Sequence, residues 1–71
     1  MAANVEAPMV GKIIAVHIEV GQQVQEDDEV MVLESMKMEN PIYAPASGTV
    51  KAINCKPGDV VNQGDVLAVI E

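Results

Sequence analysis

The chain has 71 residues, a formal net charge of −7 and one aromatic residue, Tyr43. This length provides one domain and leaves no room for a second core. Since so small a domain uses most of its residues to hold its fold, a complete catalytic apparatus with its own pocket is not expected. Eleven acidic residues against four basic ones disfavour nucleic acid as a partner, because they repel phosphates.

The expected location follows from what the chain does not contain. The longest apolar run, Val66–Ile70, is far shorter than the roughly 20 residues that a membrane span needs. The N-terminal residues carry neither the basic nor the apolar segment of a signal peptide, and the single Cys55 has no partner for an intramolecular disulfide. We therefore expect a cytoplasmic protein without direct membrane insertion.

The aliphatic residues favour strands. Val and Ile together supply 18 residues, whereas Leu supplies 2. Side chains branched at Cβ lose rotamer freedom in helices and pack well on pleated sheets. No segment has a convincing helical period, so the composition predicts an all-β domain.

In chain order, the sequence consists of two copies of one pattern, residues 6–34 and residues 43–71. A shift of 37 residues aligns them without a gap, and 9 of the 29 pairs are identical. Each copy contains Ala-Pro, a glycine turn, a β-branched strand, a second glycine turn and a second aliphatic strand. The identical pairs are Ala7/Ala44, Pro8/Pro45, Gly11/Gly48, Ala15/Ala52, Gly21/Gly58, Val24/Val61, Asp28/Asp65, Val32/Val69 and Glu34/Glu71.

The first long strand is expected over residues 14–20. Ile14, Val16, Ile18 and Val20 alternate with other residues, a period of two that is typical of a strand with one buried face. Residues 50–55 and Val66–Ile70 have the same character. Since neither copy can bury its apolar face alone, the two halves are expected to cover each other in a flattened barrel or sandwich with pseudo-twofold symmetry.

The segment 35–42 between the copies has no counterpart in the repeat. It is expected to form a turn at one end of the domain, with both termini at the other end. Lys37 lies in it between Met36 and Met38, and an exposed, mostly protonated lysine is better suited to being modified than to acting as a nucleophile. Two methionines on an exposed turn form a small adaptable apolar patch of the kind that other proteins recognise. The alternative is a solvated lysine with two methionines that pack on neighbouring strands.

These residues carry a resemblance to a known family. Glu34-Ser35-Met36-Lys37-Met38-Glu39, placed between two half-repeats, resembles the biotinyl domain of biotin carboxyl carrier proteins. The resemblance covers about Val5 to Glu71, nearly the whole chain, and we expect residues 1–71 to form a single domain. It implies a barrel-sandwich hybrid, a flattened β-barrel of two four-stranded antiparallel sheets with Lys37 at a hairpin β-turn.

The resemblance also implies a function. A biotin protein ligase would join biotin to the Lys37 amine as N6-biotinyl-lysine, using biotinyl-AMP. A biotin carboxylase would carboxylate the biotin, and a carboxyltransferase would receive or donate the carboxyl group in an acyl-CoA or oxo-acid carboxylase, transcarboxylase or decarboxylase complex. Met36 and Met38 would serve recognition by the carboxyl-transfer partners, with Glu34 and Ser35 beside them. The domain itself would be a non-catalytic carrier, and we expect it to be monomeric in isolation.

Two other readings stay open. A lipoyl domain of a 2-oxo acid dehydrogenase complex shares the fold and the lysine turn, although such domains typically have Asp-Lys-Ala at the tip. An unmodified barrel-sandwich module, as in membrane-fusion proteins of efflux pumps, would have no use for Met-Lys-Met. A metal or redox protein lacks ligands, since the chain has one His and one Cys at unrelated spacing.

Four further residues carry separate expectations. His17 is expected to be a solvated strand residue, and Cys55, which aligns with Ile18, a buried and inert thiol. Tyr43 is expected to pack beside the Lys37 hairpin. Asp27 replaces the glycine of the second copy, so it is expected in a left-handed turn.

Overall fold

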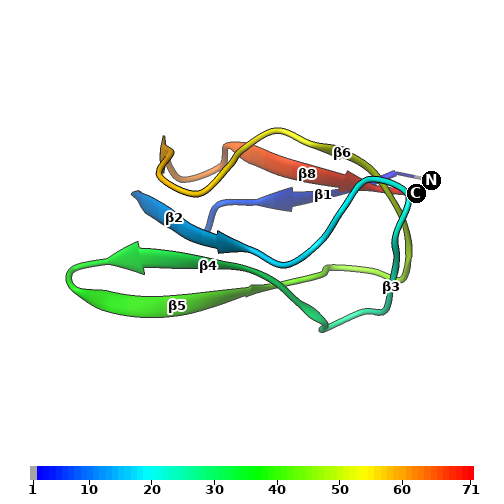
Figure 1. Cartoon of the computed structure of the whole chain (residues 1–71), viewed down its shortest axis with the longest axis horizontal. Helices are drawn as coiled ribbons and strands as arrows, with labels where there is room; N and C mark the ends of the chain where they lie inside the picture. The colour runs from blue at the N-terminus through cyan, green and yellow to red at the C-terminus, as the bar shows by residue number, and fades with distance from the viewer. Residues whose placement is uncertain (1) are drawn as a thin grey trace.

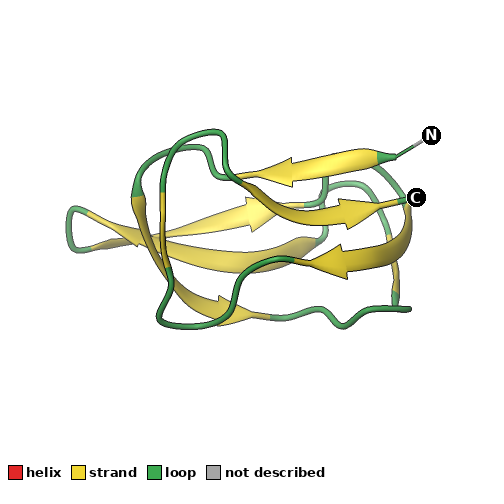
Figure 2. Cartoon of the chain, turned by 90° about the horizontal axis from the view of Figure 1, so that it is seen from above, coloured by secondary structure: helices red, strands yellow, loops and turns green. Residues whose placement is uncertain are grey.

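The computed structural model describes residues 2–71 and contains eight strands. Figures 1 and 2 show that loops and turns connect the strands, with no helix in this described part of the chain. None of residues 2–71 therefore belongs to a helix that could cross a membrane. The strands are β1 (Ala3–Glu6), β2 (Gly11–Val16), β3 (Gln23–Val24), β4 (Glu29–Ser35), β5 (Met38–Tyr43), β6 (Gly48–Ile53), β7 (Val60–Val61) and β8 (Val66–Ile70).

The strands form two four-stranded antiparallel sheets that interlock. One sheet has the order β1-β8-β6-β3 and the other the order β5-β4-β2-β7. The short strand β3 of the first copy pairs with β6 of the second copy, and β7 of the second copy pairs with β2 of the first. Each half therefore completes the sheet of the other half, which confirms the expected pseudo-twofold barrel-sandwich hybrid.

The core follows the repeat closely. Fifteen hydrophobic residues are buried, and no polar or charged residue is buried among residues 2–71. Fourteen of the fifteen are seven pairs related by the 37-residue shift, and the remaining one, Ile18, corresponds to the half-buried Cys55, which packs against the core. The pairs are Val5/Ile42, Ala7/Ala44, Ile13/Val50, Val24/Val61, Val30/Leu67, Met31/Ala68 and Leu33/Ile70.

The strand predicted over residues 14–20 is shorter and starts earlier. Strand β2 ends at Val16, and its fully buried residue is Ile13, whereas Ile14 is only half-buried and Val20 is 63 % exposed. The reason is a β-bulge between Ile13 and Ala15, where the register with β4 shifts by one residue. A bulge reverses the alternation of side chains, so the simple period of two fails at this point.

The expected turn over residues 35–42 is also wrong in its extent. Residues 38–42 belong to β5, which occupies in its sheet the place that β1 occupies in the other, so this part of the segment does have a counterpart. The loop between β4 and β5 is only Met36-Lys37. It lies at one end of a molecule of 32 × 17 × 16 Å, and the two termini lie together at the other end, as expected (Figure 1).

Candidate functional site

The turn that carries Lys37 is a two-residue hairpin loop. Ser35, the last residue of β4, pairs with Met38, the first residue of β5, and the loop residues Met36 and Lys37 have φ values of 54° and 63°. Positive φ at both central residues is the pattern of a type I′ turn, whose twist matches that of the flanking strands. Asn and Gly usually occupy such turns, because a left-handed backbone costs other residues about 1–2 kcal/mol each. The fold therefore holds two unsuited residues in a strained but defined geometry.

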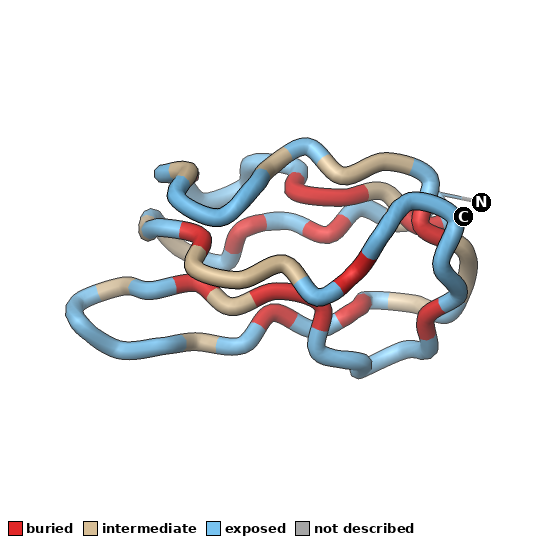
Figure 3. The backbone as a smooth tube through the Cα atoms, viewed as in Figure 1, coloured by how far each residue is buried: buried red, intermediate tan, exposed pale blue. Residues whose placement is uncertain are grey.

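The methionines beside the lysine face solvent. Met36 is 92 % exposed and Met38 is 66 % exposed, while Ser35 is half-buried. The hairpin end is pale blue in Figure 3, in contrast to the red stretches in the middle of the molecule. The alternative in which both methionines pack on neighbouring strands is thus excluded, and the tip is an apolar surface around an exposed amine.

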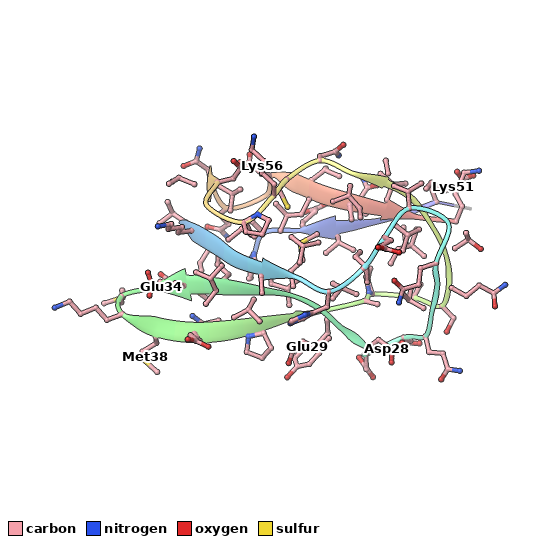
Figure 4. The ribbon with its side chains drawn as sticks, in the orientation of Figure 1. Asp28, Glu29, Glu34, Met38, Lys51 and Lys56 are labelled. Atoms are coloured by element: carbon pink, nitrogen blue, oxygen red, sulfur yellow. The ribbon has the colours of Figure 1, made fainter. Side chains whose placement is uncertain are left out.

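Two carboxylates lie directly behind this tip. Glu34 pairs with Glu39 across β4 and β5, one residue pair below Ser35 and Met38, and both are exposed. Figure 4 shows Glu34 and Met38 at the hairpin end of the molecule. Lys12 pairs with Glu34 from the other side, but among residues 2–71 the only ion pair within 4.0 Å is between His17 and Glu29. Like charges directly opposite each other destabilise a sheet, so the fold gains nothing from this acidic pair.

The structure adds one residue that the sequence had not singled out. Asn40 lies opposite Leu33, and its side-chain Nδ2 is 3.2 Å from the carbonyl oxygen of Met38 and 3.5 Å from that of Leu33. Its amide thus contacts both strands of the hairpin just below the turn. The sequence contained a signal for this residue. The 37-residue shift aligns Asn40 with Ala3, so a polar residue stands beside the Lys37 turn where the other copy, which has no such turn, has an alanine.

The remaining residues with expectations lie outside the hairpin tip. His17 lies just after β2 and is exposed as expected, with Nε2 3.4 Å from Glu29 Oε2. The placement of Tyr43 beside Lys37 is wrong: it ends β5 and pairs with Glu29, at the opposite end of the hairpin. Asp27 has a φ of 73°, which confirms the left-handed turn.

Cys55 is half-buried rather than fully buried. Its Sγ lies 3.6 Å from Met31 Sδ, and burial, with a smaller contribution from the charge of Asp59, raises the pKa of the thiol above its ordinary value. It lines a shallow groove with Asn54, Asp59 and Val66. In residues 2–71, no three His, Cys, Asp or Glu side chains are placed to hold a metal ion.

Fold and site together define a small two-sheet domain that displays one lysine on a strained, methionine-flanked hairpin. Residues 3–70 match the family model described as "Biotin-requiring enzyme". The chain belongs to this family of biotin and lipoyl attachment domains.

Individual relatives agree with this membership. The chain is 51% identical over 64 residues to the biotin/lipoyl attachment protein of Bacillus subtilis, and the match covers 90% of this chain and 88% of that protein. It is 50% identical over 70 residues to the biotin carboxyl carrier protein of Streptococcus mutans, and the match covers 97% of this chain and 54% of that protein. The crystal structure of the Kluyveromyces lactis urea carboxylase superposes on the whole chain with a TM-score of 0.92 and 35% identity.

The relatives differ greatly in length. The chain spans 88% of the Bacillus subtilis protein, but only 9% of the human propionyl-CoA carboxylase alpha chain and 6% of the urea carboxylase chain. The same domain therefore occurs both as nearly an entire protein and as a small part of a large enzyme.

Proposed function

We propose that the domain is a biotin carboxyl carrier with biotin joined by an amide bond to Nζ of Lys37. The observation that carries the proposal is the position of Lys37 on the exposed two-residue turn, at the end of the molecule far from both termini. The amine fits the group, because no carboxylate among residues 2–71 lies within 4.0 Å of it. When bound, biotin supplies the atom that accepts and releases a carboxyl group; the protein supplies position and delivery. Relatives named as biotin carboxyl carrier and biotin/lipoyl attachment proteins support this assignment.

The residues around Lys37 have separate roles in this proposal. Met36 and Met38 present the apolar surface that enters the partners' active sites, since both are exposed without being needed by the core. Glu34 lies exposed behind the tip and offers a charge to a basic partner surface. Ser35 is small and half-buried, which lets the end of β4 close the turn.

The partners follow from the carrier role. We propose a biotin protein ligase that modifies Lys37, and then a biotin carboxylase and a carboxyltransferase in a multi-component complex. The domain serves them as a non-catalytic monomer in the cytoplasm. Tethering the biotin to a small carrier raises its effective concentration at both active sites, which is the physical advantage of this arrangement.

The test uses the four lysines of the chain. The wild type, Lys37→Arg and the control Lys56→Arg are incubated with a biotin protein ligase, biotin and ATP, and their intact masses are measured. We expect one biotin on the wild type and on the control, and none on Lys37→Arg with an unchanged circular dichroism spectrum. Streptavidin binding retained by Lys37→Arg would refute the assignment.

A lipoyl carrier is the second candidate, because the name of the Bacillus subtilis relative, biotin/lipoyl attachment protein, includes both groups. Incubation with a lipoate ligase and lipoate distinguishes the two, because the groups add different masses. Modification by lipoate alone would replace biotin in the proposal, while Lys37 would remain the attachment residue.

A further inference from the structure

The side chain of Asn40 joins the two strands that lead into the turn. Its Nδ2 donates to the carbonyl oxygen of Met38 at 3.2 Å and lies 3.5 Å from that of Leu33. Met38 follows Lys37 directly in the chain and Leu33 lies on the opposite strand. The amide therefore fixes the backbone immediately after the lysine relative to β4.

The turn above this amide needs such support. Met36 and Lys37 both have left-handed backbone conformations, which residues other than Gly, Asn and Asp rarely adopt. Strained conformations persist only where the surroundings determine them fully. Since Met36, Lys37 and Met38 are all exposed, packing of their side chains does not provide this constraint.

The repeat provides an internal control. Ala3 occupies the position of Asn40 in β1 and pairs with Ile70, just as Asn40 pairs with Leu33, the counterpart of Ile70. The sheet therefore accepts a side chain without donors at this register. What differs is the hairpin, because β1 and β8 are not joined by a turn at this point.

We infer that Asn40 is a positioning residue for Lys37, whose amide holds the hairpin so that the amine is presented in one geometry to the modifying enzyme. The inference rests on the proposed attachment at Lys37. It assigns to Asn40 no contact with biotin or with the reacting atoms.

The test compares Asn40→Ala and Asn40→Asp with a matched control. Asn40→Asp keeps the shape of the side chain but removes both donors. The control is Asn54→Asp. Asn54 lies just after β6, its Nδ2 donates to the carbonyl oxygen of Val66 in β8 at 3.2 Å, and the substitution adds the same charge. All measurements are made at a temperature at which calorimetry shows every variant to be folded.

Two readouts separate positioning from general stability. For both Asn40 variants, we expect kcat/KM of biotinylation by a biotin protein ligase to fall by about threefold to tenfold, the equivalent of one lost hydrogen bond. We also expect a lower heteronuclear NOE at the Met36 and Lys37 amides, confined to the turn. The control is expected to change neither readout.

The outcomes are distinguishable. An unchanged NOE at the turn in both Asn40 variants would overturn the inference, whatever happens to the kinetics. If the wild type is biotinylated, an unchanged kcat/KM in both Asn40 variants would also overturn it. If the wild type accepts no biotin, the proposed function fails, whereas the NMR comparison still tests whether Asn40 orders the turn.

Discussion

Asp27 and Gly64 occupy equivalent positions in the two halves and share a left-handed backbone, with φ values of 73° and 89°. The backbone N–H of Asp27 donates to the carbonyl oxygen of Ala44, and that of Gly64 donates to the carbonyl oxygen of Ala7, both at 2.9 Å. The two equivalent hydrogen bonds between the halves thus require a left-handed backbone at both positions. The second copy meets this requirement with a glycine, whereas in the first copy Asp27 adopts the conformation with strain.

Replacement of Asp27 by Gly should therefore stabilise the domain. We expect Asp27→Gly to raise the free energy of unfolding by about 0.5–1 kcal/mol, since relief of the left-handed conformation outweighs the greater freedom of glycine in the unfolded chain. Calorimetry measures the change, with Asp28→Gly as the contrasting variant: Asp28 Oδ2 accepts from the N–H of Gln25 at 2.8 Å, so that substitution should destabilise. A loss of stability in Asp27→Gly would contradict the strain argument.

Gly11 is expected to tolerate alanine less well than Gly21. A Cβ at Gly11 would lie 2.5 Å from the carbonyl oxygen of Glu34 and 3.0 Å from Leu33 Cδ1, whereas a Cβ at Gly21 meets nothing within 4 Å and is opposed only by a φ of 93°. We expect Gly11→Ala to cost about 2–3 kcal/mol and Gly21→Ala about 1–2 kcal/mol. Urea unfolding followed by circular dichroism ranks the two, and a reversed order would show that β4 yields easily at Glu34.

The acidic pair behind the tip should oppose folding. We expect Glu39→Gln to raise the free energy of unfolding by about 0.2–1 kcal/mol at low salt, because it removes the charge opposite Glu34. The gain should shrink at high salt, where exposed charges are screened. Glu6→Gln is the control, since Glu6 pairs with the uncharged Val66. An equal gain in both variants would assign the effect to net charge instead of to the pair.

Cys55 should react slowly and limit stability at alkaline pH. Because burial raises its pKa, the folded state binds the thiol proton more tightly than the unfolded state does. This contribution to stability is complete below the ordinary thiol pKa and is lost as the pH rises through that value toward the raised one. Unfolding measured between pH 7 and pH 10 should show this decline in the wild type and a weaker decline in Cys55→Ala. Iodoacetamide should alkylate the folded protein more slowly than the urea-unfolded chain.

The sequence predicts much of this fold because its repeat is visible. The shift of 37 residues correctly relates pairs such as Ile13/Val50 and Leu33/Ile70, in which both residues are buried. The position of Lys37 at a protruding turn follows from the same alignment. Both predictions rest on the repeat: the paired core positions occur in each copy, and the turn lies where the first copy ends and the second begins.

What the sequence does not predict depends on pairing between strands. The bulge after Ile13 changes which residues face inward, and nothing in the composition of residues 11–16 marks it. The position of Tyr43 depends on where β5 starts, and hence on a loop of only two residues. The contacts of Asn40 are with the carbonyl oxygens of Leu33 and Met38, which lie near its side chain only when the hairpin has formed.

The pairing of Ala3 with Ile70 brings both ends of the described strands to the side of the molecule away from the turn. A longer chain joined at either end would thus hold the domain by its base. The domain, 32 Å in its longest dimension, would then separate the point of attachment from the lysine. Rotation of the domain about that point of attachment would move the Lys37 amine over a wider range than motion of the lysine side chain alone.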